Sequence, residues 1–246
     1  MPEMRKLALV LLIGLLSLSI LPVIQIRADS HKVLILSSLQ KLVPIRNEDL
    51  TMITKPLTAA GYLITYLADD QITVKFVTTS LNNFDVIIWR TNTYVDGHTT
   101  YWYLGEAASA ATLRDYSSDF ASRWLDDSHG IIGANPTFFQ NHLNARSLWR
   151  VKLAILVSSL SSSIGGFMLN AGARSVVTYS SSFSLQFSLV DNLTGTLVRY
   201  LSQGYNVGDA VTNTLAPYLM MQPRDPLDSI QVPQMAFSGD SAVTIA

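Results

Sequence analysis

Five short apolar segments, separated by stretches of helical character, constrain the fold of this chain more than any other feature. They are KVLILSSL (32–39), YLITYLA (62–68), FDVIIWRTN (84–92), VKLAILV (151–157) and RSVVTYS (174–180). Short runs rich in Val, Ile and Leu are typical of strands that are buried on both faces of a sheet. Helical stretches alternate with them, at 47–60, 162–170, 184–204 and 206–219. This order predicts a three-layer α/β fold with a mainly parallel central sheet and helices on both faces.

Two parts of the chain give weaker signals. From Thr93 to Arg150 tyrosines, glycines and charges are scattered, and we expect short helices there, at 107–125 and 137–145. The segment QMAFSGDSAVTI (234–245) predicts a last strand, with a hairpin partner that begins around Gly239-Asp240.

The first 28 residues have the pattern of an export signal, because two basic residues precede an uncharged apolar run over 7–24. A run of this length exceeds the ~7–15 apolar residues of a cleaved signal and approaches the ~20 needed to span a bilayer. Cleavage after Ala28 and retention as an anchor over 7–26 therefore both stay open. We expect a secreted or cell-surface protein with one domain over 29–246.

Composition excludes several function classes. Charged residues make up 14% of the chain and the net charge is -1, so no basic field is present to bind nucleic acid or an anionic membrane. With no cysteine, thiolate catalysis, thiolate zinc sites and iron–sulfur clusters are excluded. Asp126-Asp127 with His129, and Asp69-Asp70, lack the spacing of a calcium or zinc site. We expect no cofactor and no metal.

Polar residues follow two of the predicted strands, where ligands gather in open parallel sheets. One group is Arg90-Thr91-Asn92 and the other is Ser158-Ser159-Leu160-Ser161. Arg90 suits either an acidic ligand group or an ion pair with Glu106. The nearby aromatic residues suit peptide or sugar binding, or equally the covering of a core edge: Trp89, Tyr94, Tyr101, Trp102 and Tyr103. The candidate binding residues are Arg90, Tyr94, Trp102, Glu106 and Ser161.

The chain resembles the caspase, gingipain and CHAT group of cysteine peptidases over residues 32–245. FDVIIWRTN is similar to the group's "YDVIIxxxH", and LVSSLSSSIGGFMLNAGA to its "LxxCxS … aGA". The close MAFSGDSAVTI resembles "l.GDPsl.l", with Ser241 where proline is usual. The resemblance implies a caspase-like fold whose third strand ends at a catalytic histidine and whose fourth ends at a catalytic cysteine. In this chain Asn92 and Ser159 stand at those two positions.

These two departures remove both halves of the dyad. A thiol can be converted largely to thiolate, whereas a serine hydroxyl needs a positioned general base, and asparagine is not a base. The sequence therefore favours a non-catalytic domain that binds a peptide or a protein partner, or acts as a scaffold. One alternative is a hydrolase that uses Ser159 or Ser158 with His98, oriented by Glu106 or Asp96. The other is a structural protein of the cell envelope.

Overall fold

The computed structural model describes residues 31–127, 129–144, 146–180, 186–219 and 234–245. The predicted leader lies outside these residues. Within the described ranges, no helix combines the length and the apolar character needed to cross a membrane.

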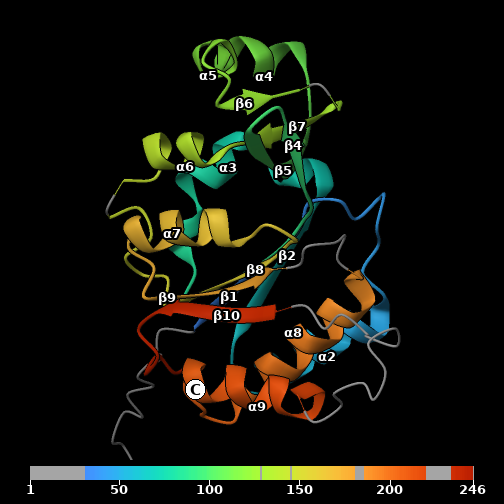
Figure 1. Ribbon diagram of the computed structural model, residues 1–246, viewed down its shortest axis with the longest axis vertical. Helices are drawn as coiled ribbons and strands as arrows, with labels where there is room; N and C mark the ends of the chain where they lie inside the picture. The colour runs from blue at the N-terminus through green and yellow to red at the C-terminus, as the bar shows by residue number, and fades with distance from the viewer. Residues whose placement is uncertain (1–30, 128, 145, 181–185, 220–233, 246) are drawn as a thin grey trace, which may run out of the picture. The chain divides into compact units, whose positions relative to one another are not determined.

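A six-stranded sheet forms the centre of the domain (Figure 1). Its strands are β1 (Lys32–Ser37), β2 (Leu63–Ala68), β3 (Val86–Arg90), β8 (Leu153–Val157), β9 (Ser175–Ser180) and β10 (Gln234–Gly239). They lie in the order β10-β9-β8-β3-β1-β2, and only β10 runs antiparallel to its neighbour. The predicted mainly parallel sheet is confirmed.

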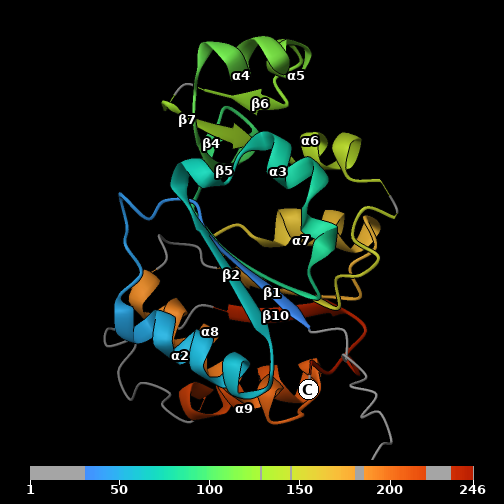
Figure 2. The ribbon, with the colours of Figure 1, turned by 180° about the vertical axis from the view of Figure 1, so that it is seen from behind.

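Helices cover both faces of this sheet (Figures 1 and 2). One face carries α2 (Asn47–Ala59), α8 (Phe187–Ser202) and α9 (Val207–Leu219), and the other carries α3 (Val74–Thr79), α6 (Pro136–His142) and α7 (Ser162–Asn170). Two short 3-10 helices, Asp69–Gln71 and Leu81–Asn83, flank α3. Successive strand residues point to opposite faces, so Val33 and Ile35 join the core under α2 and α8, while Leu34 and Leu36 join the core under α3 and α7. The three-layer α/β architecture predicted from the sequence is thus present.

A second sheet lies in the region where the sequence indicated only short helices and loops. Its antiparallel strands are β4 (Thr93–Asp96), β5 (Thr99–Ala107), β6 (Leu125–Asp126) and β7 (Ile131–Ala134), and the helices α4 (Ala110–Asp115) and α5 (Ser117–Ala121) lie between β5 and β6 in the chain. Gly97, with φ of 60°, and His98 form the two-residue turn between β4 and β5. A glycine at the start of a two-residue turn is a hairpin signal. At Gly97 the sequence-based prediction missed this signal.

The predicted hairpin at Gly239-Asp240 is wrong. β10 ends at Gly239 and pairs with β9 instead, and no strand follows over 240–245. Arg174, just before β9, fixes the turn, because its carbonyl accepts the Asp240 N–H (2.9 Å) and its guanidinium binds the Asp240 carboxylate (2.7 Å). Val243 and Ile245 then pack into the core.

Candidate functional site at the ends of β3 and β8

The carboxyl ends of β3 and β8 lie next to each other in the sheet. Arg90 is opposite Val157, and the Thr91 N–H donates to the Val157 carbonyl (3.1 Å). Beyond the strands, the Thr93 and Ser159 hydroxyl oxygens are 3.1 Å apart. The segments that carry positions 92 and 159 therefore meet at one edge of the sheet.

Asn92 uses its side chain to cap the start of β4. Its Oδ1 atom accepts the Thr93 N–H (2.9 Å), and its backbone carbonyl accepts the Tyr103 N–H (3.2 Å). The side chain is half-buried. Because an amide oxygen accepts hydrogen bonds but does not take a proton near neutral pH, Asn92 orients the backbone here and cannot act as a general base.

The serines after β8 differ in their surroundings. Ser161 is fully buried, and its Oγ atom both donates to the Tyr179 carbonyl and accepts the Tyr179 N–H, at 2.8 Å each. It therefore ties the start of α7 to β9. Ser158 is also fully buried, but among the described residues its hydroxyl has no hydrogen-bond partner. Ser159 is half-buried and pairs with Thr93.

We expect the substitution Ser158→Ala to leave the free energy of unfolding unchanged or to raise it by about 1 kcal/mol, because it removes a buried hydroxyl without a partner. The matched variant Ser161→Ala loses two hydrogen bonds and leaves the buried Tyr179 N–H without its acceptor. It should therefore lower the free energy of unfolding by roughly 1–3 kcal/mol. Urea denaturation of both variants measures the difference. An equal loss in the two would mean that Ser158 has a partner.

Arg90 does not pair with Glu106, contrary to one of the two sequence-based expectations. The Arg90 side chain is 4% exposed, and its Nε atom binds the Asp191 carboxylate at 2.8 and 3.1 Å. Its Nη1 atom donates to the Val43 carbonyl (2.7 Å), and its guanidinium lies 4.4 Å from the centre of the Phe187 ring. Arg90 thus joins β3, the segment before α2 and the start of α8.

Asp191 is a residue that sequence reasoning missed. Burial raises its pKa above the ordinary value of 3.8, and the Arg90 guanidinium, which lowers it, offsets this only in part. The ionised carboxylate therefore costs free energy at neutral pH despite its partner. The one available signal was that Asp191 is the only charged residue between 186 and 198, in a helix with a leucine face.

The Glu106 carboxylate accepts hydrogen bonds from the first turns of two helices, α3 and α4. Its Oε2 atom accepts the Val74 N–H (2.7 Å) at the start of α3, and its Oε1 atom accepts the Thr112 hydroxyl (2.6 Å) in α4. A carboxylate is favourable at the N-terminus of a helix. Both oxygens are thus engaged away from Arg90.

His98 lies at the far tip of the β4–β5 hairpin, exposed to solvent. Thr93, which contacts Ser159, is at the opposite end of β4, about 10 Å away along the strand. Asp96 binds Arg123 (3.2 Å) at this tip. The hairpin therefore holds His98 away from the serines, and neither Asp96 nor Glu106 orients it toward them.

The two tryptophans near the strand ends belong to the core. Trp89 and Trp102 are fully buried, with ring centroids 5.7 Å apart in an edge-to-face arrangement. Trp89 Nε1 donates to the Ser38 hydroxyl (2.9 Å) after β1. The structure thus places Trp102 beneath the sheet end and not at its surface, because alternate residues of β5 face the core.

The tyrosines occupy the other face of the small sheet. The Tyr94 ring lies 5.2 Å from that of Tyr101, 4.7 Å from that of Tyr103 and 4.4 Å from that of His129, measured between centroids. Its hydroxyl donates to Asp126 (2.6 Å). Burial and this carboxylate raise the pKa of Tyr94 well above its ordinary range. The Tyr94 ring is therefore enclosed by its neighbours and covers the edge of the sheet.

The acidic pairs considered as metal sites have other partners. Lys41 binds both residues of the pair Asp69-Asp70. Its backbone N–H donates to the Asp69 carboxylate (3.2 Å), and its Nζ atom donates to the Asp70 carboxylate (2.6 Å). Over the described ranges, no group of three His, Asp or Glu side chains converges on a point where a metal ion could bind.

Comparison with known proteins gives weak likenesses only. No family model matches the chain, and no curated protein matches it. Among solved structures, the chain is similar to the Drosophila initiator caspase Dronc, with 10% identity, a TM-score of 0.39 and coverage of 87% of this chain and 81% of that one. It is also similar to the pyridoxal kinase from Staphylococcus aureus, with 9% identity, a TM-score of 0.31 and coverage of 85% and 98%. Both TM-scores are too low to carry an assignment of family or function.

Proposed function

We propose that residues 29–246 form an exported, caspase-like domain that has lost its reaction centre and binds a peptide or protein at the ends of β3 and β8. The observation that carries the proposal is the 3.1 Å contact between the Thr93 and Ser159 hydroxyls. It joins the two segments that would carry the histidine and the cysteine of a working enzyme. Here they carry Asn92, whose oxygen caps a backbone N–H, and Ser159, whose hydroxyl among the described residues lies against the Thr93 hydroxyl and not against a base.

The absence of cysteine from the chain allows a direct test of this site. In the variant Ser159→Cys the only thiol stands at position 159, and Asn92→His supplies a base at position 92. We expect the thiol pKa in this double variant to fall by roughly one unit or more from ~8.5, because a neighbouring imidazolium stabilises the thiolate. The rate of alkylation by iodoacetamide as a function of pH measures that pKa.

The matched control carries Asn92→Gln with Ser159→Cys, which keeps an uncharged amide at position 92. If the alkylation profiles of the two double variants coincide, the side chains at 92 and 159 do not form a former dyad and the proposal fails. A fluorophosphonate that labels the unmodified chain but not Ser159→Ala would instead identify a serine hydrolase. That result would contradict the proposal that the domain has lost its catalytic activity.

The binding role has its own test with the same engineered thiol. A benzophenone maleimide attached to Ser159→Cys should cross-link a peptide or protein from the native cell envelope on irradiation. The control is Ser202→Cys, where the side chain lies on the surface of α8. Capture at 159 and not at 202 supports a ligand at the strand ends. No specific capture at 159 would favour a structural role in the envelope.

The leader pattern over 1–28 supports the export part of this proposal. N-terminal sequencing of the protein from its native cells distinguishes the two forms, since a cleaved chain begins at Asp29 and an anchored chain retains residues 7–26. Recovery of an uncleaved chain from the cytoplasmic fraction would contradict export.

A further inference from the structure

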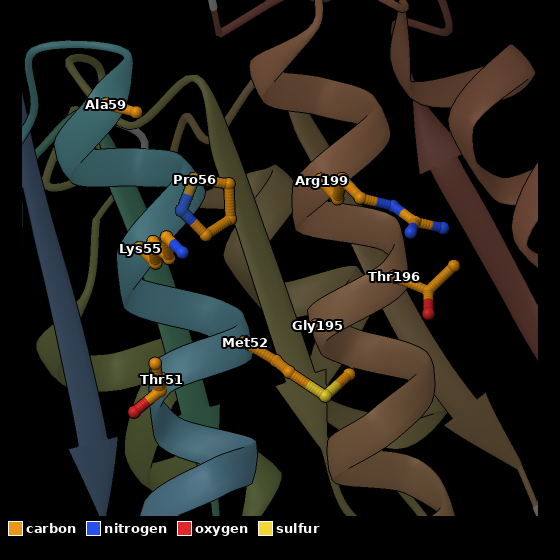
Figure 3. Close-up of a pocket in the computed structure, with 8 residues that line it drawn as sticks. All are labelled: Thr51, Met52, Lys55, Pro56, Ala59, Gly195, Thr196 and Arg199. Atoms are coloured by element: carbon orange, nitrogen blue, oxygen red, sulfur yellow. The ribbon is translucent and has the colours of Figure 1, made fainter.

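A groove of about 590 Å³ runs between α2 and α8, on the outer side of the helix layer (Figure 3). Its floor is apolar and is formed by Met52, Pro56 and Ala59 from α2 and by Gly195 from α8. Ile53 and Leu57 of α2, by contrast, point inward to the core. The groove is therefore a feature of the protein surface that the packing on the sheet does not use.

Gly195 makes the close approach of the two helices possible. A Cβ atom at this position would lie 2.9 Å from Met52 Cβ and 3.1 Å from Met52 Cε. Figure 3 shows the Met52 side chain reaching across from α2 to this glycine. Met52 is nevertheless 37% exposed, although a methionine side chain is usually buried. The floor of the groove thus presents apolar surface to solvent.

The charges at the groove have one sign. Lys55 and Arg199 line it, no carboxylate does, and neither cation forms an ion pair within the described parts of the chain. The Arg199 guanidinium lies 5.4 Å from the centre of the Tyr200 ring. The acidic residues of the two helices are engaged at the other end, where Arg46 binds Glu48 and Asp49, and Arg90 binds Asp191.

We propose that this groove binds a small amphiphile with an aliphatic chain and an anionic head group, a carboxylate or a phosphate. The volume lies within the range of about 300–1,000 Å³ found for small-ligand pockets. The apolar floor suits the chain, and the lining of α2 from Thr51 to Ala59 extends about 12 Å. Lys55 and Arg199 supply the complementary charge for the head group. This inference does not depend on the function proposed for the strand ends.

The Met52 methyl group reports directly on the floor of the groove. With methionine methyl groups labelled with ¹³C in the full, detergent-free chain, we expect dodecanoate or dodecyl phosphate to shift the Met52 resonance, which Met52→Leu assigns. Lys55→Glu should weaken this binding by roughly tenfold. Lys75→Glu, an exposed lysine on α3, changes the net charge equally and should leave the affinity unchanged.

The two anionic probes distinguish a fatty acid from a phospholipid-like head group through their relative affinities. Equal binding of dodecyltrimethylammonium, or of inorganic phosphate alone, would overturn the proposal, since it requires both a negative head and a chain. Unchanged affinity in Lys55→Glu would also overturn it. A Met52 shift that depends on protein concentration without a probe would assign the groove to a second copy of the chain instead.

Discussion

Replacement of Asp191 by alanine is expected to lower the free energy of unfolding by roughly 3–5 kcal/mol, because it leaves the Arg90 guanidinium buried without its counter-charge. Arg90 is 4% exposed and Asp191 3%, so water cannot replace the lost partner. Guanidinium denaturation of the variant measures the loss. The exposed Arg174–Asp240 pair is the control, and Asp240→Ala should have a much smaller effect.

Removal of both charges separates this explanation from a simple loss of packing. In the double variant Arg90→Met with Asp191→Leu the two buried charges disappear together, and we expect most of the stability to return. The raised pKa of Asp191 also indicates that burial of its charge is unfavourable. Because it is raised in the folded state, the folded chain binds the proton more tightly than the unfolded chain. The contribution of Asp191 to the free energy of unfolding therefore falls as the pH rises from 3.8 through the raised pKa. A double variant as unstable as Asp191→Ala would contradict this account.

The second large effect is expected at Gly105, where Gly105→Ala should cost about 3 kcal/mol or more. Gly105 has a φ of 116°, which side chains other than glycine rarely adopt. An added Cβ atom would also lie 2.6 Å from the Asp69 carbonyl oxygen and 3.2 Å from Ser38 Cα, and both are backbone atoms. β5 would have to move away from the end of β1. Thermal unfolding followed by circular dichroism measures the cost.

Gly97 provides the matched control for Gly105. It also has a positive φ, of 60°, but a Cβ atom there would meet nothing within 4 Å. Gly97→Ala therefore adds backbone strain alone and should cost only about 1 kcal/mol. Similar losses at the two positions would mean that the close approach at Gly105 relaxes without difficulty.

The order of the main elements could be predicted from sequence because each buried strand keeps its own local pattern. Apolar runs such as 153–157 lie in the centre of a sheet, and the helix at 162–170 is followed by Ala171-Gly172, where Gly172 has a positive φ. The small sheet was missed because three of its four strands have four residues or fewer, and because its residues mix tyrosines with polar groups. Only the turn at Gly97 marks it, and a single turn is a weak signal against a loose background.

The partners within the site could be predicted only in part. Asn92 and Ser159 follow β3 and β8, and the meeting of the two segments follows from the parallel pairing of these strands within the central sheet. The partner of Arg90 depends on how α8 crosses the sheet, 101 residues further along the chain, and no local pattern encodes that crossing. The nearer acid, Glu106, was the obvious choice from sequence, yet β5 turns it toward the starts of α3 and α4.

The anchoring of Trp89 and Arg90 below the sheet edge has a consequence for how this chain can change over generations. Trp89 binds Ser38, and Arg90 binds Asp191 and Val43, and none of these contacts uses the side chains at 92 and 159. Mutations at those two half-buried positions leave these contacts in place and remove the local hydrogen bonds to Thr93. A lineage can accordingly gain or lose reactivity there while the scaffold persists.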